Sequence, residues 1–493
     1  MKNSMDPLIK EVSEFLGAIP YEKSPHEDTG GCVWMGIVGS GEFLFVTGAQ
    51  AGFTGTRKQA NGTEVLIAPL THENADALRK AFPFTAPVRV LQSERTVGVG
   101  DRLGIATPGH IRVFSEYDAL PVFAQQSIRE LTLTRRTFEH VLDCATFAVF
   151  KEDFRLGFGA DGDHLKTPEE VQYALGCGYT MITLDCSEYI RNDIEPMPDE
   201  AVLALGDRYA ALQQKYEGME VTIEGETLRF SGMELLRMLH IYGAAIDFAV
   251  KIYEDYMKDA NADFEISIDE TQTPTTPLQH YFVANELYGR GVRPATIAPR
   301  FCGEFQKGID YIGDIGQFRA EFRAHAAIAR RFGYKISVHS GSDKFSVFPT
   351  VGELTRGRFH VKTAGTNWLE AMRIVALRDP ALYREVHAFA LEKFQEARAY
   401  YHVTTDLAKI PPLDTLKDAE LSELFDRNEA RQLIHITYGL ILGAKNADGS
   451  ERFKERLYAL WREHAQGYAE LLNAHIGRHL KELGVGPRHE GSN

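Results

Sequence analysis

From about residue 95 onward, short runs in which apolar and polar residues alternate are each followed by a longer amphipathic stretch. Alternation with a period of two predicts β-strands, and apolar residues spaced three or four apart predict helices, for example over 317–332 and 367–377. Strands joined by helices run parallel, because a helical crossover returns the chain to the same edge of the sheet. The predicted strands number eight, as a closed (β/α)8 barrel of the TIM type requires: 96–100, 121–125, 154–158, 180–184, 264–268, 294–298, 334–338 and 358–362.

The flanking regions show other patterns. Residues 1–94 mix a short helix with β-like runs that glycines interrupt, which predicts a small α+β N-terminal region. Residues 95–378 form the predicted catalytic barrel, with a helical insertion at 186–263 after the fourth strand. Residues 379–493 predict a helical extension, although 401–404 and 433–437 also fit strands and would move the start of the barrel to Phe154. The helical interpretation is preferred, because Glu429 leads into Leu433 without a turn signal.

Polar residues occupy the inward positions of the predicted barrel strands. In the run YKISVHSGSDK (334–344), the side chains of Lys335, Ser337 and His339 fall on one face. Burying such groups against a closed apolar core costs free energy, so this face is expected to line a site. Further polar residues lie at or just beyond the C-terminal ends of the strands, where barrel enzymes place their chemistry: Ser127, Asp161, His164, Thr183, Asp269, Glu270, Arg300, Lys344 and Lys362.

Histidines at the strand ends indicate a site for a divalent metal ion. His164 and His339 lie there and are the predicted ligands. His280, which follows the fifth strand, is a candidate third ligand, with the alternative that it caps its own helix. Histidines elsewhere, such as His360 and His402, are more simply explained as interior hydrogen-bonding residues. Mixed nitrogen and oxygen ligands accommodate Zn, Mn, Ni or Co, so the sequence does not select one metal.

Acids and cations at the same mouth are the ingredients of an acid/base pair and of an anion site. Asp161 and Glu270 either take part in catalysis or pair with Arg300 and Lys362 in a structural network. These cations are best explained as binding groups for a carboxylate of the ligand.

The loop after the eighth strand is a second candidate for anion binding. It runs from Lys362 to Asn367 and precedes a helix predicted to begin near Trp368. Free N–H groups at a helix start, with Lys344 nearby, suit a phosphate or a sugar carboxylate. A plain helix cap at Thr366 or Asn367 is the alternative, and the two interpretations are compatible.

The composition excludes several classes of partner. A net charge of −15 spread along the chain argues against a nucleic acid or an anionic membrane. The five cysteines are an odd number without C-x-x-C spacing, so neither a disulfide framework nor a thiolate zinc site is expected, and a reducing cytoplasm fits best. No apolar run approaches membrane-spanning length. The stretch GVGDRLG (98–104) departs from the dinucleotide fingerprint, so no nucleotide cofactor is expected. A small-molecule substrate is therefore the expected partner, and the helical C-terminal third offers surface for a homo-oligomer.

Five segments of the chain, in order, resemble those of the tagaturonate epimerase family: GVGDRLGIATPGH (98–110), FGADGDHLKT (158–167), FCGEFQKGIDYIGD (301–314), SVHSGSDKFSVFP (337–349) and HVKTAGTNWLEA (360–371). Members are barrel enzymes that interconvert tagaturonate and fructuronate in hexuronate breakdown with a divalent metal. The resemblance covers most of residues 95–450. It implies that Asp161 and Glu270 form an acid/base pair and that His164 and His339 bind the metal.

The chemistry that the resemblance implies can be checked against the substrates. The two uronates differ at a stereocentre β to the ketone, whose C–H is not acidic, so enolisation cannot invert it. A retro-aldol cleavage of the adjacent carbon–carbon bond, giving an enediolate and an aldehyde that recombine on the other face, is the favoured hypothesis. Asp161 is then the base and Glu270 the acid on the return step. The substrate carboxylate falls to Arg300, Lys344 or Lys362, and Ser127, Thr183 and Asp269 are the other expected substrate-binding residues.

Two other functions remain open at this point. A metal-dependent aldolase, lyase or isomerase acting on another sugar acid would use the same residue types. A non-catalytic barrel that binds a sugar acid would need only the anion site.

Overall fold

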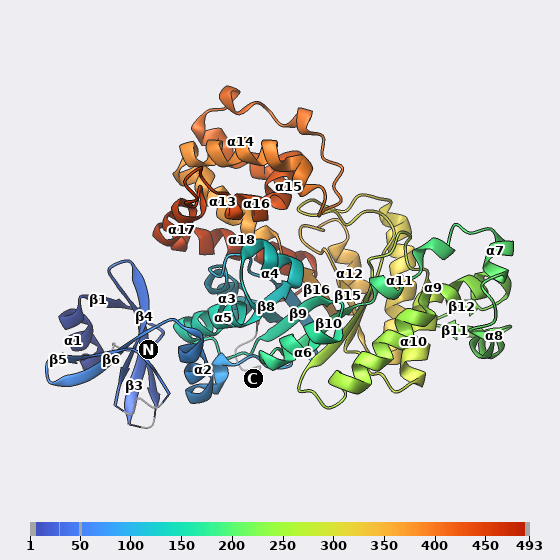
Figure 1. Cartoon of the computed structure of the whole chain (residues 1–493), viewed down its shortest axis with the longest axis horizontal. Helices are drawn as coiled ribbons and strands as arrows, with labels where there is room; N and C mark the ends of the chain where they lie inside the picture. Colours follow the sequence, from blue (N-terminus) through green and yellow to red (C-terminus); the bar gives the residue numbers. More distant parts are fainter. Residues whose placement is uncertain (1–5, 29, 49–51, 489–493) are drawn as a thin grey trace.

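The computed structural model describes residues 6–28, 30–48 and 52–488, and at its centre is a closed parallel barrel (Figure 1). Around the barrel the strands follow the order β10-β13-β14-β15-β16-β7-β8-β9. Their bounds are β7 (Arg95–Val99), β8 (Leu120–Ser127), β9 (Gly159–Leu165), β10 (Met181–Asp185), β13 (Asp263–Ile268), β14 (Thr296–Pro299), β15 (Lys335–Val338) and β16 (Phe359–Thr363). The predicted (β/α)8 barrel is confirmed, and all but one of its predicted strands overlap an observed one.

The third strand lies later in the chain than alternation predicted. Residues 154–158 form a loop, in which Phe154 and Phe158 pack against Phe123 of β8 with ring centroids 5.5 and 5.6 Å away. The strand itself, β9, has the polar, glycine-rich sequence GADGDHL. A Cβ added at Gly162 would lie 2.9 Å from the Cβ of Ala174 in helix α6 (Pro168–Gly176). Close packing against this helix therefore replaces the apolar alternation on which the prediction relied.

Helices cover the outside of the barrel and bury the apolar faces of its strands. On β13, Phe264, Ile266 and Ile268 belong to the largest hydrophobic cluster, whereas Glu265 bonds to side chains inside the barrel. At the barrel wall, the apolar residues that alternate along the strands therefore pack against the apolar stripes of the helices. The surrounding helices are α3 (Thr107–Glu116), α4 (Ile128–Thr134), α5 (Phe138–Glu152), α6, α10 (Pro277–Gly289), α11 (Ile315–Phe332), α12 (Phe348–Leu354) and α13 (Thr366–Arg378).

The N-terminal region forms an antiparallel sheet at one end of the molecule (blue in Figure 1). Its strands follow the order β1-β3-β4-β6-β5, and β2 pairs with β3. Phe147 and Phe150 of α5 share a hydrophobic cluster with this sheet, which attaches it to the outside of the barrel. The elements are α1 (Pro7–Leu16), β1 (Ala18–Pro20), β2 (His26–Asp28), β3 (Gly31–Val38), β4 (Gly41–Thr47), β5 (Thr56–Ala60), β6 (Thr63–Pro69) and α2 (His72–Ala81).

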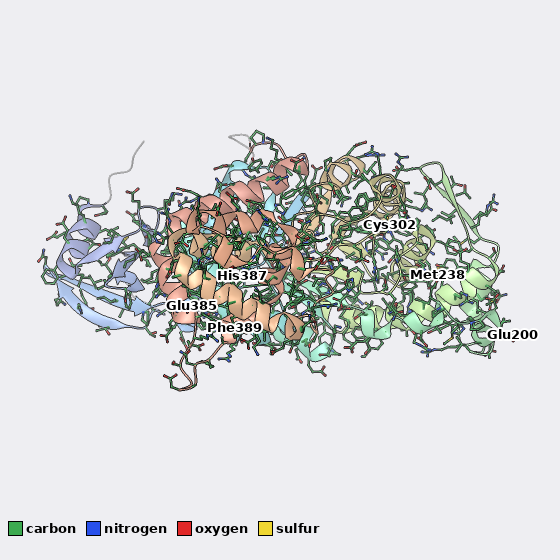
Figure 2. The ribbon with its side chains drawn as sticks, turned by 90° about the horizontal axis from the view of Figure 1, so that it is seen from above. Glu200, Met238, Cys302, Glu385, His387 and Phe389 are labelled. Carbon is green, nitrogen blue, oxygen red and sulfur yellow. The ribbon has the colours of Figure 1, made fainter. Side chains whose placement is uncertain are left out.

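The insertion between β10 and β13 contains a hairpin besides the predicted helices. It comprises α7 (Asp199–Leu203), α8 (Ala210–Tyr216), β11 (Glu220–Ile223), β12 (Glu226–Arg229) and α9 (Gly232–Ile252). It extends the molecule at the end opposite the N-terminal sheet, where Figure 2 labels Glu200 and Met238.

The C-terminal helices pack together above the barrel in the view of Figure 1. Trp368 of α13 and Trp461 lie in a hydrophobic cluster of their own, with ring centroids 6.0 Å apart. The helices are α14 (Pro380–Ala397), on which Figure 2 labels Glu385, His387 and Phe389, α15 (Asn428–Ile436), α16 (Tyr438–Gly443), α17 (Lys454–Glu463) and α18 (Ala465–Glu482). Residues 433–436 are helical and 401–404 are irregular, so the helical interpretation of this region is confirmed.

Each of the five cysteines is free. Among the helices of the described residues, none combines the length and apolar character that a membrane span needs.

Candidate active site

The inward polar residues converge at the C-terminal end of the barrel, where they line a cavity. Asp163 and His164 of β9, Asp269 after β13, His339 after β15 and Lys362 of β16 all face it. An outer cleft continues toward the C-terminal extension, and the two spaces share Arg129, Asp269, Glu270, Lys307, His339 and Ser340. TIM-type enzymes place their chemistry at this end of the barrel, so the mouth is the candidate active site.

A buried lysine lies among three acids beneath the mouth. Lys362 Nζ lies 2.7 Å from Asp161 Oδ2, 2.7 Å from Asp163 Oδ1 and 2.8 Å from Glu265 Oε1. These four residues, called the upper cluster below, are at most 7% exposed. Thr183 adds a hydroxyl that donates to Asp161 Oδ1 at 2.9 Å. One ammonium cannot neutralise three carboxylates, so the cluster favours a retained proton or a further cation.

Proton affinities differ within the upper cluster. Burial raises the pKa of Asp161 to about 7, although the Lys362 ammonium opposes this. Burial also raises the pKa of Glu265, but the Lys362 and His339 cations outweigh it and hold that pKa well below its usual value. Burial lowers the pKa of Lys362, yet the surrounding carboxylates prevail and raise it well above normal. Asp161 is therefore the member able to gain or lose a proton near neutral pH.

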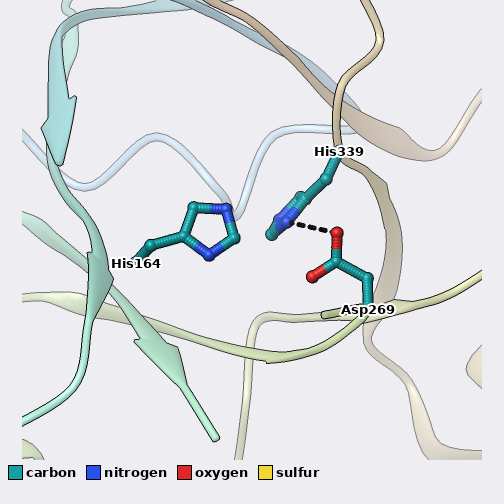
Figure 3. Close-up of side chains that lie close together, drawn as sticks. All are labelled: His164, Asp269 and His339. Carbon is teal, nitrogen blue, oxygen red and sulfur yellow. Dashed lines mark ion pairs between the residues drawn. The ribbon is translucent and has the colours of Figure 1, made fainter. Parts of the chain in front are cut away.

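Two imidazoles and a carboxylate face one another beside the upper cluster (Figure 3). The ring centroids of His164 and His339 are 4.8 Å apart, and His339 Nδ1 lies 3.3 Å from Asp269 Oδ2. One donor atom from each of these three residues, called the imidazole cluster below, lies within 4.8 Å of the others. On its far side, His339 Nε2 lies 2.7 Å from Glu265 Oε1, which joins the two clusters.

The donor atoms of the imidazole cluster fit a divalent metal. The Nδ1 atoms of His164 and His339 are buried and have no hydrogen-bond partner among the described residues. Nitrogen and carboxylate donors together are a common ligand set for first-row divalent ions. A neighbouring group formed by His164, Asp185 and Glu270 also brings its donor atoms within 4.8 Å of one another. The mouth therefore offers clusters of residues that can hold a metal ion.

Nearby carboxylates raise the pKa of both imidazoles. Burial lowers the pKa of His339, but Asp269 and Glu265 outweigh it and raise that pKa to about 10. The pKa of His164 is likewise raised, because Asp163 outweighs burial. Burial raises the pKa of Asp269, yet His339 lowers it to about 2. A metal ion bound at this position would displace protons from the rings.

Irregular backbone brings these side chains to the mouth. The register between β9 and β10 shifts, and His164 adopts a φ of 53°. The shift allows the consecutive residues Asp163 and His164 both to face the cavity, which regular alternation forbids. Ser340, directly after His339, has a φ of 49°. Left-handed backbone at non-glycine residues costs about 1–3 kcal/mol and is concentrated at functional sites.

The sequence and the fold match known proteins over nearly the whole chain. The family model described as tagaturonate epimerase matches residues 21–483. The chain belongs to the tagaturonate epimerase family. A tagaturonate/fructuronate epimerase of Thermotoga maritima is 42% identical over 471 residues, which cover 94% of this chain and 96% of that protein.

Solved structures agree with this family. The crystal structure of the fructuronate-tagaturonate epimerase UxaE from Cohnella laeviribosi, complexed with one glycerol, is 47% identical with a TM-score of 0.93, covering 97% of this chain and 100% of that chain. The native crystal structure of the same enzyme gives the same identity and TM-score, with coverage of 97% and 99%. The family resemblance of the five sequence segments is thus confirmed, and this family member is an isomerase.

Most predicted site residues of this epimerase family member lie at or beneath the mouth. Glu270 is exposed and lines both the cavity and the outer cleft. Asp161 is fully buried and does not line the cavity, but it touches Lys362, which does. Thr183 lies with Asp161 inside the barrel. Ser127 lines the cavity and caps α4 by accepting a hydrogen bond from the backbone.

His280 lies outside the mouth, and Asp269 is the third residue whose donor atom lies near those of His164 and His339. Its Nδ1 is 2.9 Å from His325 Nδ1, and its Nε2 is 2.7 Å from Tyr334 Oη. Both ring nitrogens are thus engaged between α10 and α11 in the barrel wall, because His280 lies within the first turns of α10 and not in the preceding loop. Asp269 was predicted only as a substrate-binding residue.

Two of the cations predicted to bind the substrate carboxylate are engaged with backbone. Lys344 is buried, and its Nζ donates to three carbonyl oxygens at 2.6 to 2.8 Å. Arg300 donates to the carbonyl of Thr271 and lines only the outer cleft. Helix α13 begins at Thr366, two residues before the predicted start, and no side chain caps it.

Sequence reasoning missed Arg129 and Lys307, which line both the cavity and the outer cleft. Neither lies on a strand: Arg129 is in the first turn of α4, and Lys307 is in the loop after β14. Alternation therefore carried no signal for them. Glu265 was detectable, because it falls on the inward face of β13 by the same parity that selected the other site residues.

A second group of histidine and carboxylate donors is already engaged in contacts within the protein. Asp343, His475 and His479 bring donor atoms within 4.8 Å of one another. However, His479 Nε2 accepts the backbone N–H of Asp343 at 2.9 Å, and its Nδ1 lies 2.8 Å from the His475 carbonyl. Arg431 lies 2.7 Å from the Asp343 carboxylate and neutralises it. This group braces the loop after β15 against α15 and α18.

Proposed function

We propose that this protein interconverts D-tagaturonate and D-fructuronate with a divalent cation held by His164, Asp269 and His339. The relatives that match almost the whole chain are named for these two sugar acids. The observation that carries the proposal is a buried acid of pKa about 7 next to an imidazole cluster whose Nδ1 atoms make no hydrogen bond with the described residues. When bound, the cation supplies stabilisation of the negative charge that develops on the substrate oxygens.

The reaction is a carbon–carbon cleavage followed by recombination. A base takes the proton of the hydroxyl on the carbon to be inverted, and the O–H electron pair becomes the second bond of an aldehyde. The electron pair of the adjacent carbon–carbon bond moves into an enediolate. Attack of the enediolate on the opposite face of the aldehyde re-forms the bond, and the proton returns to the new hydroxyl.

Asp161 is the proposed proton acceptor, acting through Lys362. The Lys362 ammonium lines the cavity and lies 2.7 Å from Asp161 Oδ2. As Lys362 takes the substrate proton it passes one to Asp161, so that the buried lysine keeps its charge. A carboxyl group with a pKa of about 7 both accepts and returns a proton near neutral pH.

Glu270 is the proposed acid on the return step. Its carboxylate lies at the exposed rim, within 4.8 Å of donor atoms of His164 and Asp185. Asp161, in contrast, is completely buried. Two carboxyl groups at different depths suit a reaction in which a proton leaves the hydroxyl on one face of the carbon and returns to the hydroxyl formed on the other.

A solvent-isotope experiment tests this proposal. Metal-loaded protein is incubated with D-tagaturonate in D2O, and the products are followed by NMR. We expect D-fructuronate to form while the hydrogen on the inverted carbon is retained, and a chelator to abolish turnover until a divalent cation is returned. Deuterium at the inverted carbon would contradict carbon–carbon cleavage, and net release of three-carbon fragments would identify a lyase.

A further inference from the structure

Two cations at the mouth have no acidic partner. Lys307 Nζ donates to Ser340 Oγ at 3.0 Å, and the Arg129 guanidinium lies 5.0 Å from the ring centroid of Tyr401. Neither is joined to a carboxylate within the described ranges 6–28, 30–48 and 52–488. In a chain of net charge −15, half-buried Lys307 and exposed Arg129 face one cavity without an acidic partner in the described ranges, which indicates an anionic ligand.

The backbone around Lys307 is held in place from several sides. The carbonyl of Gln306 accepts a hydrogen bond from Lys344 Nζ at 2.8 Å, and that of Gly308 accepts one from Arg431 Nε at 2.7 Å. Arg129 is held by its contact with Tyr401 of the C-terminal extension. Cations presented on braced backbone lose little freedom when they bind a ligand, which is characteristic of a built binding site.

Two further buried residues at the cavity carry nitrogens without a partner in the part of the chain that the structure describes, although Arg102 pairs with Glu130 through its other nitrogens. Arg102 and His435 are 2% and 1% exposed and line the same cavity. Arg102 Nη1 and both ring nitrogens of His435 have no hydrogen-bond partner among the described residues. Burial, followed by the charges of Arg129 and Arg102, lowers the pKa of Lys307. An anion beside Lys307 offsets the repulsion between these cations.

The remaining cations at the mouth are less suited to a carboxylate. Lys362 is surrounded by three acids, which repel a further negative charge. The ammonium of Lys344 is used by three backbone carbonyls. Arg300 lies only on the outer cleft and donates to a carbonyl oxygen.

We propose that Lys307 and Arg129 form a subsite for the carboxylate of the uronate, an inference that rests on the proposed function. The keto end of the substrate then lies toward the imidazole cluster, because that cluster and the Lys307–Ser340 pair line the same cavity. After carbon–carbon cleavage the aldehyde fragment carries the carboxylate. Held at Lys307 and Arg129, this fragment stays in the cavity while its aldehyde presents the other face.

The test compares a substrate that carries a carboxylate with an analogue in which a neutral group replaces the carboxylate. The KM for D-tagaturonate and the apparent competition constant of D-tagatose, which has CH2OH in place of the carboxylate, are measured on metal-loaded protein. For the wild type we expect the KM for D-tagaturonate to be at least about a hundredfold lower than the competition constant of D-tagatose. Lys307→Met removes the charge at similar side-chain length and should reduce this ratio at least about tenfold. The KM for D-tagaturonate should rise, while the competition constant of D-tagatose should stay the same.

Two further variants control this result. Lys307→Arg keeps the charge and should retain the preference within about threefold, and melting temperatures verify folding. A preference unchanged in Lys307→Met, or lost in Arg300→Met instead, overturns the subsite while wild-type turnover of D-tagaturonate leaves the proposed function intact. Absence of wild-type turnover overturns both.

Discussion

The barrel interior contains two buried lysine–histidine pairs in opposite electrical surroundings. At the mouth, Lys362 and His339 lie among carboxylates, and the pKa of each is raised despite burial. Toward the N-terminal ends of the strands, Lys335, His360 and Thr96 form what we call the lower cluster. Lys335 Nζ donates to Thr96 Oγ1 at 2.9 Å and to a backbone carbonyl at 2.7 Å, and Thr96 Oγ1 lies 2.9 Å from His360 Nδ1.

Burial dominates in the lower cluster. It lowers the pKa of Lys335 to about 7 and that of His360 to about 3. The residues of both pairs lie on β15 and β16 or directly after them, so these two strands alone do not decide which pair is charged. The acids of β9 and β13 do, because they face the upper pair. The barrel therefore concentrates charge at its mouth and keeps its lower layer close to neutral.

The largest expected effect distinguishes the two histidines. His339→Ala removes a proposed metal ligand, and we expect bound metal to be lost and kcat/KM to fall by about 10³-fold, since metal stabilisation of developing charge contributes several kcal/mol. His360→Ala removes the same group from the lower cluster and should retain the metal. Elemental analysis and steady-state assays of both folded variants decide this, and equal metal content in the two would refute the assignment.

The second prediction concerns the lysine of the upper cluster. Lys362→Met leaves Asp161, Asp163 and Glu265 buried without their counter-ion, which should cost about 3–5 kcal/mol in the free energy of unfolding at pH 8. Without the ammonium these acids bind protons more readily in the folded state, so the deficit should shrink as the pH falls toward 5.5.

Urea denaturation of both proteins across this pH range measures the effect. Lys393→Met, which removes a surface lysine 3.1 Å from Glu396, is the control and should cost less than about 1 kcal/mol. A deficit in Lys362→Met that does not change with pH would show that packing, and not charge, is responsible.

The alternation of inward-facing and outward-facing residues along each strand, called parity here, accounts for most of what could be predicted from the sequence. Alternation in β13 and β16 turned Glu265 and Lys362 inward, and the structure joins them at 2.8 Å. The same rule failed for β9, where helix packing requires Gly162 and the apolar pattern lies in the preceding loop. Parity also gave no reason for Asp163 and His164 to face one cavity, because that depends on a register shift between strands.

Residues positioned by long-range contacts were beyond the reach of periodicity. Lys307 faces the cavity because Arg431 and Lys344, from other parts of the chain, fix its neighbours. His280 was assigned to the mouth from its position after a strand, but three residues of helix turn it toward His325. A sequence shows which side chains can reach the barrel end, and only tertiary contacts decide which of them meet.

The smallest expected effect is a difference in pH dependence between the two lysines. The pKa of Lys335 is about 7 in the folded protein against 10.5 ordinarily, so between these values the unfolded chain binds more protons and stability rises with pH. The slope from one such group approaches about 1.4 kcal/mol per pH unit. The raised pKa of Lys362 lies above this window, so its contribution there is constant. Free energies of unfolding at pH 7.5, 8.5 and 9.5 should therefore diverge between the wild type and Lys335→Met, with the wild type gaining as pH rises. Parallel curves would mean that Lys335 keeps its proton, and that the lower cluster is charged like the mouth.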